Sequence, residues 1–184
     1  MSGAGSQGAY QSAVIQGLIN YMPDPEVNLH YDVVAGVSAG SLNALGMAPF
    51  KPEEITEAAE FLFNLWTSVS DYEVIGNWPN GGLIRGLIYE QGVFNLNPGK
   101  KWVTDQFGNK TVNRVVSFSA TDSKAGIYEV FEYNATGTVP DDFIETAFAS
   151  SSIPLVFPPT KIGDYELIDG GCVWNVDLIT GVRR

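Results

Sequence analysis

The sequence Gly36-Val37-Ser38-Ala39-Gly40 lies between an apolar run at residues 31–35 (YDVVA) and a helix-like run at residues 41–45 (SLNAL). A strand, a sharp turn and a helix in this order form a nucleophile elbow, because two glycines let the backbone fold tightly around an exposed serine. The alternative is an ordinary glycine turn whose serine caps the helix. The flanking strand and helix favour the elbow, with Ser38 as the nucleophile between Gly36 and Gly40.

A serine nucleophile needs a base, and the chain contains a single histidine, His30. His30 precedes Ser38 by eight residues on the expected strand, and eight extended residues span about 26 Å. This separation is far beyond hydrogen-bond reach. We therefore expect a base other than His30. A histidine beyond Arg184 in a longer chain is the open alternative, although only 37 residues precede Ser38, where α/β-hydrolases have several strands.

A second motif, Ile168-Asp169-Gly170-Gly171, follows an expected strand at residues 162–168. An Asp-Gly pair is often a structural turn and nothing more. A carboxylate held against the Ser38 hydroxyl, however, is able to accept its proton. Because a carboxylate is a weak base for a hydroxyl, such chemistry relies on strong stabilisation of the oxyanion.

A third motif, Gly3-Ala4-Gly5-Ser6-Gln7-Gly8, stands directly before an expected helix at residues 9–22. In dinucleotide sites this Gly-x-Gly-x-x-Gly pattern is followed by an acidic residue at the end of the next strand. Here the next strand ends in Gly36-Val37-Ser38, which disfavours a dinucleotide. Backbone amides at the start of a helix also bind a developing oxyanion, which suits acyl transfer to a serine.

The three motifs, in this order, resemble the patatin-like phospholipases, which pair a Gly-x-Ser-x-Gly serine with the aspartate of an Asp-Gly-Gly or Asp-Gly-Ala motif. Residues 8–11 (GAYQ) and 149–159 (ASSSIPLVFPP) are also similar to that family, so the resemblance covers nearly the whole chain. It implies that Ser38 is the nucleophile and Asp169 the base. It implies oxyanion donors in the backbone of four residues: Gly3, Ala4, Gly5 and Ser6.

The resemblance also implies hydrolysis of fatty-acyl esters of phospholipids or other glycerolipids through an acyl-enzyme, as in lipid degradation. No spacing of His, Cys and acidic residues indicates a metal site, and we expect neither a metal nor a cofactor. Two positions depart from the family pattern, because Ala4 replaces a usual glycine and Gln7 a usual arginine or lysine. A lipid-binding or interaction domain with weak catalysis is therefore the alternative function.

Composition limits the class of protein and its partners. The chain has 184 residues, 45% of them hydrophobic, which suits one globular domain over residues 1–184. Its net charge of −11 argues against nucleic acid and gives no attraction to anionic lipid. The resemblance implies a lipid substrate and transient contact with a membrane or lipid-aggregate surface, and with this charge such contact would rest on apolar residues. No signal peptide or membrane-spanning run is recognised, and the compartment stays open.

Alternating helices and strands predict an α/β domain with a mostly parallel central sheet. The resemblance makes this a three-layer α/β/α patatin-like domain, truncated at both ends, whose oxyanion loop lacks an anchoring strand before Gly3. Besides those named above, the expected elements are helices from residue 51 and at 98–107 and 141–150, and strands at 112–120 and 127–133. Residues 71–99 form an irregular apolar excursion that lines an acyl channel, touches a membrane or covers the core.

Overall fold

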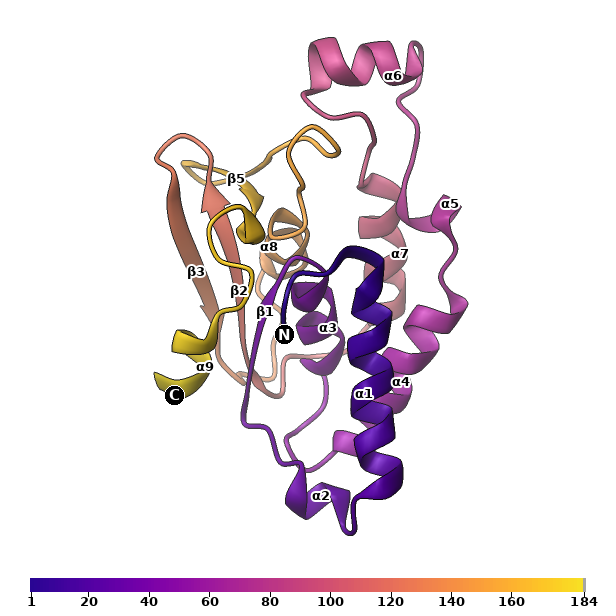
Figure 1. The fold of residues 1–184 in the computed structure, drawn as a ribbon, viewed down its shortest axis with the longest axis vertical. Helices are drawn as coiled ribbons and strands as arrows, with labels where there is room; N and C mark the ends of the chain where they lie inside the picture. The colour runs from indigo at the N-terminus through magenta and orange to yellow at the C-terminus, as the bar shows by residue number, and fades with distance from the viewer. Residues whose placement is uncertain (184) are drawn as a thin grey trace.

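The computed structural model describes residues 1–183, apart from the side chains of residues 71 and 72. Its centre is one five-stranded sheet in which β2 pairs with three other strands (Figure 1). The strands are β1 (Val33–Val37), β2 (Val115–Asp122), β3 (Ile127–Tyr133), β4 (Thr160–Ile162) and β5 (Tyr165–Asp169). The middle of β2 is buried on both faces, as expected for the central strand of a layered α/β domain.

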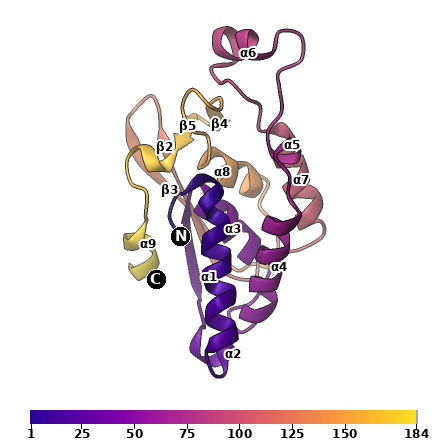
Figure 2. The ribbon, with the colours of Figure 1, turned by 45° about the vertical axis from the view of Figure 1, so that its right-hand side comes forward.

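Helices pack on both sides of this sheet. They are α1 (Gly8–Tyr21), α2 (Pro25–Asn28), α3 (Ala39–Met47), α4 (Ile55–Ser68), α5 (Asp71–Val74), α6 (Gly82–Arg85), α7 (Asn97–Phe107), α8 (Phe143–Ala149) and α9 (Leu178–Arg183), with the short turns η1 (Gly5–Gln7), η2 (Gly86–Glu90) and η3 (Gly170–Cys172). Figure 2 shows α1, α3 and α4 on one side of β1 and α9 on the other. The α/β class and the layered arrangement are thus as the sequence predicts.

The core lies between the sheet and the larger helical layer. Phe118 of β2, Tyr133 of β3 and Phe143 of α8 form an aromatic cluster, with ring centroids 4.9–5.6 Å apart. Apolar side chains of α3 and α4, including Leu45 and Leu62, complete this core at 1–2% exposure. Burial on this scale fixes α3 against the sheet, and α3 begins directly after Ser38.

The prediction of a mostly parallel sheet is wrong in one respect. Of the four strand pairings only β1–β2 is parallel, so the sheet is mixed. The reason is local, because β2 and β3 are joined by the short turn at 123–126, and β4 and β5 by Gly163-Asp164. Connections of this length make hairpins, whereas parallel strands need a long crossover.

The expected strand at 162–168 is also corrected, because it spans the end of β4, a turn and most of β5. Gly163 has φ 57°, which a two-residue hairpin turn requires and which glycine adopts without strain. The helices expected at 9–22, 98–107 and 141–150 are confirmed to within two residues at each end. The hairpin expected from the strands at 112–120 and 127–133 is confirmed as well.

The pairing of β2 decides where the two candidate catalytic residues lie. On one edge β2 pairs with β3 along residues 116–122. On its other edge β1 pairs with residues 115–119 and β5 with residues 120–122. The parallel β1 and the antiparallel β5 therefore run toward each other along the same edge. Their carboxyl ends meet where Val37 pairs with Ser119 and Asp169 pairs with Ala120.

Candidate active site

Ser38 occupies a tight turn between β1 and α3. Its backbone has φ 53° and ψ −128°, a conformation that disfavours residues with a Cβ by about 1–3 kcal/mol. A Cβ added to Gly36 would lie 2.3 Å from the Gly40 carbonyl oxygen, and one added to Gly40 would lie 2.4 Å from the Met1 carbonyl oxygen. The two glycines thus permit the close chain passage that an elbow requires, and Ser38 is 6% exposed.

Ser150 holds this turn in place. Its Oγ accepts a hydrogen bond from the Ser38 amide at 2.8 Å and donates one to the Ser119 carbonyl at 2.6 Å. The Ser150 carbonyl also accepts from the Gly170 amide at 3.3 Å. One residue therefore joins the ends of β1 and β5 to the middle of β2. The Ser38 amide, being already donated, is not free for a ligand.

Asp169 ends β5 with its carboxyl group in an asymmetric environment. Oδ1 accepts a hydrogen bond from the Gly171 amide at 2.7 Å. Oδ2 is buried and has no hydrogen-bond partner among the groups of residues 1–183. Burial raises the pKa of this carboxyl, while the Ser38 hydroxyl and the Gly171 amide oppose that rise. One oxygen is thus held by the backbone and the other is left without a donor.

Ser38 and Asp169 are brought together by the meeting of β1 and β5. A Cβ added to Gly170 would lie 2.3 Å from the Ser119 carbonyl oxygen and 3.0 Å from the Val37 side chain, so the two strand ends touch. The Ser38 hydroxyl is close enough to lower the pKa of Asp169 without completing a regular hydrogen bond to Oδ2. The candidate nucleophile and the candidate base therefore face each other across this junction.

His30 is not part of this arrangement. Its Nε2 lies 3.5 Å from Asp32 Oδ1 in an exposed pair before β1 begins. Within residues 1–183, no group of three or more His, Cys, Asp and Glu side chains is placed to hold a metal ion. The only histidine of the chain is thus paired away from Ser38, as the length of β1 predicts.

The glycine loop reaches the site from the start of α1, but one of its four expected oxyanion donors is already bonded. A Cβ added to Gly3 would lie 2.9 Å from Ser38 Cβ, so the loop touches the elbow. The Gly3 amide, however, donates to the Asn175 carbonyl at 3.0 Å and is not a free donor. This finding leaves Ala4, Gly5 and Ser6 as the predicted oxyanion donors. Ala4 caps η1, and Gly5 and Ser6 begin it, where the first amides have no partner within the helix.

The backbone of the loop explains how it tolerates its departures from the family pattern. Ala4 has φ −156° and ψ 5°, and its negative φ lies outside the left-handed region that favours glycine. Gly5 has φ 53°, which favours glycine. Gln7 is exposed, and no positive charge replaces the missing cation at that position.

The oxyanion loop was expected to lack an anchor before Gly3, but hydrogen bonds hold it to three parts of the molecule: β1, Gln11 and Asn175. The Met1 carbonyl accepts from the Val37 amide at 3.1 Å, and the Met1 amino group donates to Ala35, so this residue lies along β1. Gln11 Nε2 donates to the Ser2 carbonyl at 2.8 Å. On the far side, Asn175 Nδ2 donates to the Gly3 carbonyl at 2.8 Å.

Sequence reasoning missed two residues of the site. Ser150 stands in the quoted run 149–159 but received no role, and Asn175 was not singled out. Each acts on a partner more than a hundred positions away, and no local pattern reports such contacts. The one signal in the sequence is the position of Ser150, at the end of the expected helix and just before Ile153-Pro154, where a polar side chain is free to bond to another part of the chain.

An apolar cavity of about 100 Å³, partly open to the surface, lies against α3. Leu42, one turn along α3 from Ser38, lines it together with Trp66 of α4 and Phe148 of α8. Val74 and Gly99, the two ends of the apolar excursion, line it as well. The ends of the excursion thus cover the interior, as one of the three sequence-based interpretations predicts, whereas its middle does not.

Comparisons with known proteins were made on both the sequence and the fold. A family model described as patatin-like phospholipase matches residues 1–180. Among solved structures, the fold is similar to that of VipD from Legionella pneumophila, with a TM-score of 0.50 and 12% sequence identity. That similarity covers 96% of this chain and 46% of the VipD chain, so this chain spans less than half the length of that neighbour. No curated protein matches the sequence.

Proposed function

The chain belongs to the patatin-like phospholipase family, and on that premise we propose that it is a serine acyl hydrolase of fatty-acyl esters. Residues 1–184 act as one domain, with Ser38 as nucleophile and Asp169 as base. The substrates are phospholipids or other glycerolipids, met at a membrane or lipid-aggregate surface. Neither a metal nor a cofactor takes part.

In the proposed reaction Asp169 Oδ2 accepts the Ser38 Oγ proton while Oγ bonds to the ester carbonyl carbon. Amides of Ala4, Gly5 and Ser6 donate to the oxyanion that forms. The carbon–oxygen bond to the alcohol then breaks, and the alcohol leaves with the proton from Asp169. Water attacks the resulting acyl-enzyme, giving its proton to Asp169, and the fatty acid leaves as Ser38 regains its hydroxyl.

The single observation that supports this proposal most is the buried Asp169 Oδ2. It lacks a hydrogen-bond partner among residues 1–183, and the Ser38 hydroxyl is close enough to the same carboxyl group to lower its pKa. A buried polar atom without a partner is destabilising by about 1–3 kcal/mol, so one left beside a candidate nucleophile points to a chemical role. The raised pKa of Asp169 agrees with that role, because it makes the carboxylate a better proton acceptor.

The test uses a fluorophosphonate probe and a soluble short-chain ester, so that lipid binding does not enter. We expect the probe to label the chain, and Ser38→Ala to abolish labelling. Ser38→Ala and Asp169→Asn should each lower ester hydrolysis by about 10⁴-fold, the order found when a carboxylate partner is removed from a catalytic serine site. Matched controls are Ser151→Ala and Asp164→Asn, which change the same residue types outside the site.

Full activity in a folded Ser38→Ala or Asp169→Asn variant would contradict the dyad. A second function is favoured by Gln7 and by the occupied Gly3 amide, which leave fewer charges and donors near the oxyanion. In that case the protein binds lipid and hydrolyses little. A folded chain that binds lipid but resists the probe and leaves the ester intact supports this alternative.

A further inference from the structure

One segment of the molecule, residues 82–90, leaves its apolar side chains uncovered. This projecting segment consists of α6 and η2, and Figures 1 and 2 show it standing away from the rest of the domain. Five large apolar side chains on it are 55–78% exposed: Leu83, Ile84, Leu87, Ile88 and Tyr89. Exposed apolar groups gathered on one short segment mark an interaction surface rather than part of a core.

The projecting segment is electrically neutral. Arg85 and Glu90 are its only charged residues, and no others occur anywhere in residues 74–99. They pair with each other, with Arg85 Nη2 2.9 Å from Glu90 Oε1. The remainder of the protein carries a large negative charge, since the whole chain has −11. The surface that the segment offers is therefore apolar and uncharged within an acidic molecule.

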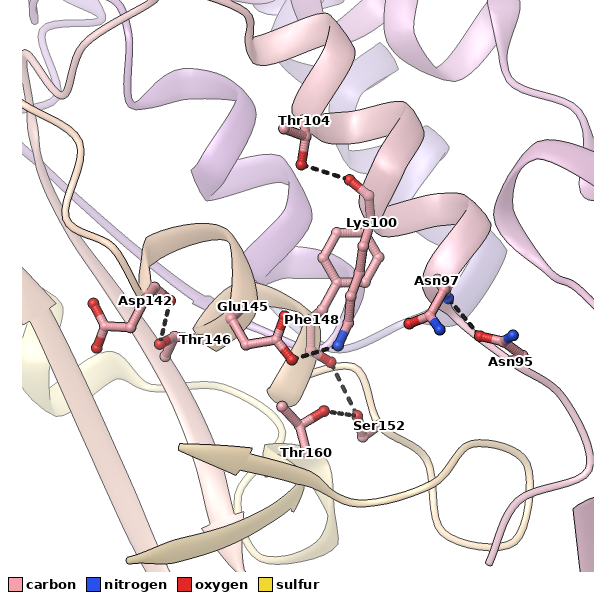
Figure 3. Close-up of polar contacts among 10 residues, drawn as sticks. All are labelled: Asn95, Asn97, Lys100, Thr104, Asp142, Glu145, Thr146, Phe148, Ser152 and Thr160. Carbon is pink, nitrogen blue, oxygen red and sulfur yellow. Dashed lines mark hydrogen bonds and ion pairs between the residues drawn. The ribbon is translucent and has the colours of Figure 1, made fainter. Parts of the chain in front are cut away.

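The base of the projecting segment is held firmly by the body of the domain. Trp78 Nε1 donates to the Gly92 carbonyl at 2.9 Å, which joins its two ends. The following residue, Val93, donates its amide to the Leu155 carbonyl at 3.0 Å. Figure 3 shows Lys100 of α7 reaching Glu145 of α8, so the helix after the segment is fixed as well. A fixed base presents the apolar tip in a defined direction.

The segment lies at the same end of the domain as the candidate active site. Leu155, on which the base of the segment pairs, lies five residues after Ser150, which binds the Ser38 amide. Leu155 is itself 75% exposed and adds an apolar side chain at the base of the segment. In Figures 1 and 2 the segment projects beyond the end of the domain at which α1 and α3 begin, and Ser38 directly precedes α3.

We propose that residues 82–90 dock this protein on the surface of a zwitterionic phospholipid aggregate. The inference rests on the proposed function, because a lipid substrate is what an apolar surface at the same end of the domain as Ser38 would meet. Apolar side chains enter the boundary between headgroups and acyl chains, and the ring of Tyr89 suits that boundary. The neutral tip and the acidic remainder favour zwitterionic over anionic lipid. Across residues 1–183, none of the helices combines the length and apolar character needed to cross a bilayer.

The test measures binding to phosphatidylcholine vesicles by co-sedimentation in a Ser38→Ala background, which keeps the vesicles intact. The variant Ile84→Ser/Ile88→Ser should bind at least about tenfold more weakly, since two apolar side chains are lost from the contact. A matched control, Tyr21→Ser/Val27→Ser, removes two side chains that are 92% and 76% exposed at the opposite end of the domain. This control should bind like the unchanged protein. Vesicles of phosphatidylglycerol should bind more weakly than phosphatidylcholine.

The outcomes separate this inference from the proposed function. In an otherwise unchanged chain, Ile84→Ser/Ile88→Ser should keep hydrolysis of a soluble ester and lose hydrolysis of vesicles. Equal vesicle binding by this variant and the control would overturn the inference, whether or not Ser38 is a nucleophile. Specific vesicle binding without any ester hydrolysis would uphold it and overturn the proposed function. Self-association that depends on Ile84 and Ile88, with no vesicle binding, would assign the surface to a second copy of the chain.

Discussion

The turn at Ser38 and the projecting segment at residues 82–90 are built in opposite ways. Ser38 is 6% exposed, in a strained backbone conformation, and its amide is bonded to Ser150, which in turn is bonded to β2. The projecting segment has large side chains at 55–78% exposure and only its base is tied down. Stability is thus concentrated where the chemistry is proposed, and the apolar surface for lipid contributes little to the fold. Substitutions in the two regions should therefore separate stability from lipid binding.

The largest effect on stability is expected at the elbow. In Gly36→Ala the new Cβ would lie 2.3 Å from the Gly40 carbonyl oxygen and 2.6 Å from Ser41 Cα, both of which are backbone atoms of α3. We expect a loss of about 3 kcal/mol in the free energy of unfolding, measured by denaturant titration. Gly17→Ala on α1 is the control, since nothing lies within 4 Å of its Cβ. The free energy of unfolding of that control should rise by about 0.5–1 kcal/mol. Equal losses in Gly36→Ala and Gly17→Ala would show that the elbow is no more sensitive than the surface of α1.

The second effect concerns the residue that joins the strands. Ser150→Ala leaves the Ser38 amide and the Ser119 carbonyl buried without this partner. We expect a loss of about 1–3 kcal/mol in stability, together with lower ester hydrolysis because Ser38 is no longer held. Ser151→Ala is the comparison, as Ser151 Oγ donates only a 3.3 Å bond to Ala147. If both variants behaved alike in thermal unfolding and hydrolysis, the role given to Ser150 would be wrong.

The third effect depends on pH through Asp169. Burial raises its pKa in the folded protein, so the folded state holds the proton more tightly than the unfolded chain. The favourable contribution is complete below the ordinary aspartate pKa and is lost as the pH rises through the raised value. Asp169→Asn should therefore be more stable than the unchanged protein at neutral pH, with a difference that shrinks on acidification. Denaturant titrations from pH 4 to 8 measure it, and a difference that grows on acidification would contradict the assignment.

The same raised pKa bears on hydrolysis. Asp169 must be ionised to accept the Ser38 proton, so kcat/KM should fall on the acid side at a pH above the usual aspartate range. The pH profile of kcat/KM for a soluble ester reports the pKa of the Asp169 carboxyl in the free enzyme.

The smallest effect is expected in the projecting segment. Ile84→Ser/Ile88→Ser changes side chains that are 70% and 66% exposed, so the free energy of unfolding should stay within about 0.5 kcal/mol. Thermal unfolding without lipid measures this. A loss comparable with that of Gly36→Ala would show that these side chains support the fold, and the contrast between the two regions would fail.

The sequence predicts the fold class and the main elements around the site because those signals are local. Residues 31–45 carry a strand, a glycine turn and a helix, and the structure forms them in that order. The β4–β5 hairpin was not predicted, because residues 162–168 have the composition of a single strand apart from Gly163. Apolar composition marked residues 71–99 as unusual, but it could not separate the ends that line the cavity from the exposed middle. Only packing against α3 and α8 makes that distinction.

The positions of Ser38 and Asp169 relative to each other also exceed what local pattern supplies. Their proximity follows from the register of β1 and β5 on one edge of β2, which joins residues far apart in the chain. The occupied amide of Gly3 is a further long-range effect, because its acceptor belongs to Asn175. The order of the motifs supports the choice of Ser38 and Asp169 as site residues. Contacts between distant parts of the chain determine where these residues lie and which backbone amides remain free.

The two hydrogen bonds between Gly3 and Asn175 affect the order in which the site forms during synthesis. The side-chain hydrogen bond spans 172 positions, so the loop around Gly3 gains this support only after Asn175 has left the ribosome. Closing so long a loop is slow and comes late in folding. The elbow and its helix α3, by contrast, lie within the first 47 residues, and the contact of the elbow with Ser150 forms before Asn175 emerges. A growing chain would therefore carry its candidate nucleophile long before the loop beside it is secured. This order would delay reactivity until Asn175 has emerged and folded against the loop.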